Sequence, residues 1–156
     1  MGLTRNVRPF KICNAVIEIV QEYNYLGVYF TSNGLFTRTK AHIIEQANKA
    51  MFALLRKIKT LDLPYDIQIE LFDKTVKPIL LYASEMWSFG KNDVLEVQLK
   101  FFKYVFNLKK STPSYMIYGE LGIFPIVLDM KYRTISYRIK LIENASSDNV
   151  KLSTKT

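Results

Sequence analysis

The longest regular pattern in the sequence is a set of apolar residues that recur three or four positions apart between Thr37 and Leu61. This spacing places them on one face of an α-helix. The apolar positions are Ile43, Ile44, Ala47, Ala50, Met51, Leu54, Leu55, Ile58 and Leu61. A helix of this length with a single apolar stripe has to cover that stripe with other elements, so the pattern predicts a bundle of helices.

The segment before this helix predicts two short strands. Residues 10–20 and 25–30 are rich in β-branched and aromatic residues, and the polar residues 21–24 between them are typical of a turn. Two short strands are only marginally stable alone. We expect residues 1–34 to form a β-hairpin, which would be more stable if it packed on a larger sheet upstream.

Further helices are expected after Pro64, where a proline suits the first turn of a helix. Pro78 should interrupt that helix, and Tyr82 and Trp87 beyond it are predicted to be core residues. Gly90 is expected to end the helix that contains Tyr82 and Trp87, and Gly122 is expected to end a short helix capped by Thr112. The expected helices cover about 64–76, 79–87, 93–108 with Asn92 or Asp93 as its cap, 113–121 and 126–142.

These elements predict a mainly α protein in which a short N-terminal β-hairpin precedes a bundle of about five helices over residues 35–143. After Glu143 the periodicity is lost, and residues 144–156 are predicted to be a flexible tail.

Charge is unevenly distributed along the 156 residues, whose net charge is +8. Residues 35–61 carry six basic residues and one acidic residue, and residues 91–143 carry nine and five, whereas residues 62–90 carry two and five. Such a balance favours a polyanionic partner, either nucleic acid or an anionic membrane surface. The alternative is that the basic segments are ordinary solvated helix faces.

Several classes of function are disfavoured by what the sequence contains. Cys13 and His42 are the only residues of their types, so a disulfide within the chain and a zinc site are excluded, and we expect an intracellular location, cytoplasmic or nuclear. The acidic residues Asp66, Glu70 and Asp73 are interpreted as a solvated stripe and not as a metal site. No apolar run approaches the about 18 residues needed to cross a bilayer. We therefore expect no metal, no cofactor and no membrane partner.

Three ordered motifs carry a resemblance to a known family. They are Tyr25-Leu26-Gly27, then Pro78-Ile79-Leu80-Leu81-Tyr82 followed by Trp87, and then Glu120-Leu121-Gly122-Ile123-Phe124-Pro125. Over residues 10 to 143 the chain resembles the region that follows the catalytic palm in the reverse transcriptases of non-LTR (LINE-type) retrotransposons.

This resemblance implies a role in holding a template–primer duplex of RNA and DNA. The Tyr25-Leu26-Gly27 turn would be the primer grip, which holds the 3′ end of the growing strand, and the helices would be the thumb, which follows the duplex backbone. The basic residues expected to face phosphates are Lys49, Arg56 and Lys57 on the first long helix and Lys100 and Lys103 on a later one. Phe101 and Tyr104 lie beside those last lysines in the sequence and could stack on bases, although packing between helices explains them equally well.

The same resemblance predicts that the chain does not polymerise alone. The family binds its two magnesium ions with carboxylates that include an adjacent Asp-Asp pair, and no Asp-Asp pair occurs in this sequence. We expect the palm and fingers upstream, so that the chain is a fragment of an RNA-directed DNA polymerase that binds nucleic acid and needs Mg²⁺ only within the parent enzyme. The palm and fingers are then a possible partner.

Two alternatives come from other classes of function. The first is a helical protein–protein interaction module without a nucleic-acid function. The second is a peripheral membrane binder, which is disfavoured because the aromatic residues fall mostly on expected core faces.

Overall fold

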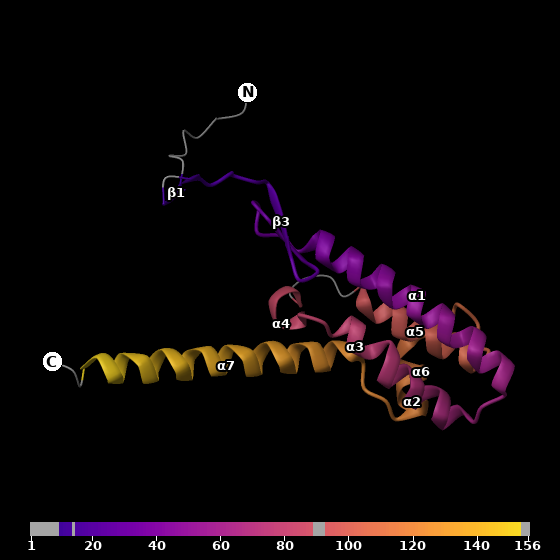
Figure 1. The fold of residues 1–156 in the computed structure, drawn as a ribbon. Coiled ribbons are helices and arrows are strands. Elements are labelled where there is room, and N and C mark those ends of the chain that lie inside the picture. Colours follow the sequence, from indigo (N-terminus) through magenta and orange to yellow (C-terminus); the bar gives the residue numbers. More distant parts are fainter. Residues whose placement is uncertain (1–9, 14, 89–92, 154–156) are drawn as a thin grey trace.

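The computed structural model describes residues 10–13, 15–88 and 93–153, and their fold is mainly helical (Figure 1). Short antiparallel strand pairs precede the helices, as predicted. The helices are α1 (Thr37–Leu61), α2 (Tyr65–Thr75), α3 (Lys77–Leu80), α4 (Ser84–Trp87), α5 (Val94–Val105), α6 (Ser114–Leu121) and α7 (Ile126–Ser153). The predicted fold class is therefore confirmed.

The N-terminal strands differ from the prediction in their positions. β1 (Lys11–Ile12) pairs with β2 (Ala15–Val16), and β3 (Glu22–Tyr25) pairs with β4 (Val28–Thr31). The predicted turn at 21–24 is wrong, because residues 22–25 form β3. The turn lies instead at Leu26 and Gly27, whose φ angles of 50° and 81° suit a two-residue turn that matches the twist of a hairpin.

The β3–β4 hairpin is fastened to the first turn of α1. The Tyr29 N–H donates to the Thr39 hydroxyl oxygen at 2.9 Å, and that hydroxyl donates to the Tyr29 carbonyl at 3.2 Å. Arg38 forms an ion pair with Glu22, and its guanidinium lies 4.6 Å from the centre of the Tyr29 ring. The hairpin is therefore held to α1 by polar contacts, with buried Val28 as its apolar anchor.

α1 has the predicted bounds and buries the predicted stripe. Six of the nine predicted positions are buried, and Ile44 and Ala50 pack at the edge of the core: the six are Ile43, Ala47, Met51, Leu54, Leu55 and Ile58. Leu61 was predicted to lie on the stripe, but its side chain is 62% exposed. It is the last residue of α1, and Asp62 turns the chain away with a φ of 43°.

Pro78 interrupts the helix that precedes it, as predicted, because α2 ends at Thr75 and α3 begins at Lys77. The single helix predicted for residues 79–87 is wrong, since Ala83 has a φ of 50° and separates α3 from α4. Trp87 is buried, as predicted, and its Nε1–H donates to the Tyr82 carbonyl at 2.8 Å. Tyr82 itself is 48% exposed and is not a core residue, because its hydroxyl reaches outward to the hairpin.

Aromatic rings from α2 and α5 meet at the centre of the core. The Phe72 and Phe101 ring centroids are 4.5 Å apart, and Phe101 and Phe102 are 5.9 Å apart. Phe101 is fully buried, so it cannot stack on bases beside the lysines. The phase of α5 explains this, because Val94, Val97 and Phe101 all face the core.

The start of α6 also differs from the prediction. α6 begins at Ser114 after Pro113 with no hydrogen bond from a capping side chain, so Thr112 is not its N-cap. Gly122 ends α6 with a φ of 62°, as predicted. The predicted helix end at Gly90 and cap at Asn92 lie outside the described residues.

α7 is longer than predicted. Residues 144–153 continue the helix that was expected to end near Ile142, so the predicted end of this helix is wrong. Loss of apolar periodicity does not break a helix, and no proline or glycine occurs between Ile126 and Ser153. Figure 1 shows the C-terminal part of α7 extending well beyond the bundle.

Gln98 joins α5 to α6 and α7 inside the core, where its side chain is 1% exposed. Its Oε1 accepts hydrogen bonds from the Tyr118 hydroxyl at 3.0 Å and from the Ile126 N–H at 2.9 Å. Burial raises the pKa of Tyr118 to about 12, so this hydroxyl remains a donor at neutral pH. The start of α7 thus depends on a side chain of α5.

Replacing Gln98 with leucine should lower the free energy of unfolding by about 1–3 kcal/mol, because the buried Ile126 N–H loses its acceptor. Urea denaturation followed by circular dichroism measures the change. The control is Gln46→Leu on α1, where the side chain is exposed and no such loss occurs. An equal effect of the two substitutions would contradict the role given to Gln98.

Gly27 and Gly119 form a matched pair for testing the hairpin turn. Gly27→Ala should destabilise the chain by about 1 kcal/mol, because the backbone there has a φ of 81°. Crowding is not the cause, since an added Cβ would lie 3.8 Å from the Tyr82 ring. Gly119→Ala inside α6 should stabilise the chain by about 0.5–1 kcal/mol. Thermal unfolding of both variants measures the two changes in stability, which should have opposite signs.

Candidate nucleic-acid interface

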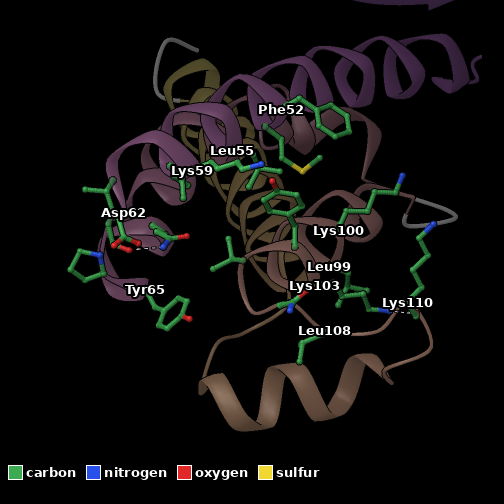
Figure 2. A pocket seen from close by; sticks show the side chains of 18 of the residues that line it. Phe52, Leu55, Lys59, Asp62, Tyr65, Leu99, Lys100, Lys103, Leu108 and Lys110 are labelled. Atoms are coloured by element: carbon green, nitrogen blue, oxygen red, sulfur yellow. Dashed lines mark hydrogen bonds between the residues drawn. The ribbon is translucent and has the colours of Figure 1, made fainter.

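A groove runs between α1 and α5 on the surface of the bundle (Figure 2). It consists of a larger hollow of about 1460 Å³ and an adjoining one of about 570 Å³. Both are lined by Phe52, Leu55, Lys59 and Tyr104, which makes the two hollows continuous. Together the two hollows form one groove along α1 and α5.

Cationic side chains line this groove from both helices. α1 contributes three of them, α5 contributes two and the loop after α5 contributes one: Lys49, Arg56, Lys59, Lys100, Lys103 and Lys110. The acidic residues that line it are Asp62 and Glu96. With six cations and two carboxylates, the groove attracts anions.

The interior of the groove is apolar and aromatic. Met51, Leu55 and Ile58 are buried and close it on the α1 side. Phe52 and Tyr104 come from opposite helices and are 58% and 55% exposed. Exposed rings beside cations are the combination that proteins use to stack on nucleic-acid bases while holding phosphates.

Two cations in the groove form ion pairs with exposed carboxylates. Lys49 lies 2.8 Å from Glu45, and both side chains are mostly exposed. The hydrogen bond from Lys49 lowers the pKa of Glu45 below its usual value. Lys100 lies 4.0 Å from Glu96. Exposed pairs of this kind are weak in water, so a polyanion can displace the carboxylates.

Lys103 is held more firmly than the other groove lysines. Its Nζ donates to the Lys110 carbonyl at 2.6 Å, which ties α5 to the loop that follows it. This hydrogen bond places the ammonium group of Lys103 at the groove wall.

The structure brings four of the five predicted basic residues together. Lys49, Arg56, Lys100 and Lys103 line the groove, although they come from segments about fifty residues apart. Lys57 is exposed but is not among the lining residues, because it is about 100° around α1 from Arg56.

Two further lining cations were not among the predicted site residues. Lys59 follows Arg56 by three positions, so helical spacing could have placed it on the same face. Lys110 lies in a loop, and no sequence pattern connects it to α1.

The predicted primer-grip residues lie elsewhere, at the N-terminal end of α1 (Figure 1). Tyr25 and Leu26 are 56% and 72% exposed, and Gly27 lines a separate hollow of about 320 Å³. The Tyr82 hydroxyl donates to the Leu26 carbonyl at 2.6 Å. Two of the three motifs therefore meet in space, but not at the groove.

Two of the three residues in the acidic stripe on α2, Glu70 and Asp73, pair with lysines. Glu70 lies 2.6 Å from Lys74, and their hydrogen bond raises the pKa of Lys74. Lys77 lies 4.0 Å from Asp73 and 2.8 Å from Asp129 on α7. In the described ranges, no three His, Cys, Asp or Glu side chains are grouped so that they could bind a metal ion.

None of the helices in the described part of the chain combines the length and the apolar character needed to span a bilayer.

Comparison of the chain with protein-family models, with curated proteins and with solved structures finds no match.

Proposed function

We propose that this chain binds the backbone of a nucleic-acid template–primer duplex through the groove between α1 and α5. The observation that carries the proposal is the convergence of cations from two helices on one concave surface. Phosphates are regularly spaced along a strand, so a line of cations binds them regardless of base sequence. Binding of this kind is strong at low salt and weakens steeply as salt is added.

The shape of the groove supports contact with one strand at a time. Lys49 and Arg56 are seven residues apart on α1, so they lie almost in line along the helix axis. The apolar interior beneath them suits sugars or an unpaired base and leaves the phosphates at the charged rims. Phe52, Tyr65 and Tyr104 are the exposed rings that line the groove and are available for such a base.

The resemblance to the thumb-like region of LINE-type reverse transcriptases supports the same class of ligand. Within it, the exposed Tyr25 and Leu26 side chains on the hairpin would meet the end of the primer strand. The chain alone would not polymerise, because the sequence lacks the Asp-Asp pair of that family. Its working context would be a parent polymerase that supplies palm, fingers and Mg²⁺, in the cytoplasm or the nucleus.

Arg56→Gln should weaken binding to a DNA–RNA hybrid about threefold and make the logarithmic salt slope shallower by roughly 0.7–0.9, because one phosphate contact is lost. The matched control is Lys57→Gln, which removes the same charge from the neighbouring residue outside the groove. Fluorescence anisotropy over a salt series measures both quantities.

Equal effects of Arg56→Gln and Lys57→Gln would contradict binding in the groove. Nonspecific attraction of the nucleic acid to a basic protein would then explain the affinity. If the wild-type chain shows no affinity for the hybrid at low salt, the proposed function is wrong. In that case a helical protein–protein interaction module is the better explanation.

Phe52→Leu should reduce affinity for a single-stranded oligonucleotide roughly fivefold or more, because stacking on an aromatic ring stabilises each bound base. The salt slope should not change, since no cation is removed. Tyr115→Leu on α6 is the control, because Tyr115 is 74% exposed and does not line the groove. An unchanged affinity for Phe52→Leu would show that bases do not enter the groove.

A further inference from the structure

α7 packs against the bundle through one face only. Ile126, Met130 and Thr134 are buried on this face, at successive intervals of four residues. Thr134 shares a hydrogen bond of 2.6 Å with Ser88, just after α4, and Ile126 is held by Gln98 of α5. The opposite face of α7 is therefore turned away from α4 and α5.

That opposite face carries a regular row of exposed apolar side chains. The row is formed by Leu128, Tyr132, Ile135, Ile139 and Ile142, which are separated by four, three, four and three residues. Their side chains are 49%, 73%, 58%, 50% and 67% exposed. Alternation of four and three is the spacing of the a and d positions of a coiled coil, and here it extends over two heptads.

We propose that this row, the α7 seam, is a self-association surface that packs in parallel against the α7 seam of a second copy of this chain. An a/d row is buried well by another helix with the same repeat, because knobs of one helix then fit holes of the other. A second copy supplies such a helix. The inference goes beyond the proposed nucleic-acid binding and does not depend on it.

The charges beside the seam indicate the parallel orientation. With Leu128, Ile135 and Ile142 at d and Tyr132 and Ile139 at a, Lys131 and Arg138 occupy g positions. Asp129 and Glu143 occupy e positions. In a parallel pair, the g side chain of one helix faces the e side chain of the following heptad on its partner. Arg138 of each copy would therefore face Glu143 of the other copy.

An antiparallel pair is disfavoured by the same residues. There g positions face g positions, so Lys131 would approach Arg138 of the second copy, and like charges repel. The seam therefore distinguishes the two orientations by charge.

The association should be weak, because the seam covers little more than two heptads. Five partly exposed side chains per copy bury less than the roughly 1,200 Å² above which interfaces become stable and long-lived. We expect the monomer at low concentration and the associated form at roughly 10–500 µM.

Sedimentation velocity of the full chain without nucleic acid, over this concentration range, tests the proposal. Ile139→Asp should abolish the association. Leu141→Asp is the matched control, because Leu141 is 49% exposed, close to the 50% of Ile139, but lies about 160° around the helix from it. Leu141→Asp should associate like the wild type, and circular dichroism should show that both variants fold.

Arg138→Glu tests the orientation. In a parallel pair this substitution places a carboxylate opposite Glu143 of the second copy and should weaken association at least threefold. The double swap Arg138→Glu with Glu143→Arg should restore it. Stronger association of the single variant would overturn the parallel arrangement.

The seam itself has two outcomes that would overturn it. One is a wild-type chain that stays monomeric over the whole concentration range, and the other is an equal effect of Ile139→Asp and Leu141→Asp. None of these readouts involves the groove.

Discussion

Burial of the apolar stripe of α1 is the interaction on which the rest of the structure depends. Each fully buried Leu, Ile or Met side chain stabilises the fold by about 1.5–3 kcal/mol, and α1 contributes five such side chains and Ala47 to the core. This burial fixes the rotation of α1 about its own axis. Once Ala47, Met51 and Ile58 face inward, Lys49, Phe52 and Arg56 have to face outward together.

The groove follows from that rotation together with the position of α5. Phe101 and Phe102 anchor α5 against the core through the ring of Phe72, and this sets Lys100, Lys103 and Tyr104 beside the outer face of α1. The cations of the groove are thus placed by apolar contacts that they do not make themselves. Repulsion among them is tolerated because the side chains are mostly exposed to water.

The two ends of α1 have different surroundings. At its N-terminal end the β3–β4 hairpin is hydrogen-bonded to Thr39 and to the Tyr82 hydroxyl, and its turn carries exposed apolar side chains. Along its C-terminal half lies the basic groove. α7, in contrast, joins the bundle through its first turns and presents the seam on its outer face. The hairpin turn, the groove and the seam are therefore three separate surfaces of the molecule.

The sequence by itself determined the helices whose apolar pattern is strong and some of the residues that those helices bury in the core. Local periodicity predicts the bounds of α1 and the burial of Trp87. The geometry of proline and glycine predicts the break at Pro78 and the end of α6 at Gly122. Only the tertiary structure decided which cations meet. Lys57 was predicted to lie at the site but does not line the groove, whereas Lys59 and Lys110 line it without having been predicted. The reason is that the groove depends on how α5 and its loop lie against α1. It also placed Phe101 in the core and Tyr82 under the hairpin, since local spacing does not say which neighbour a side chain will meet.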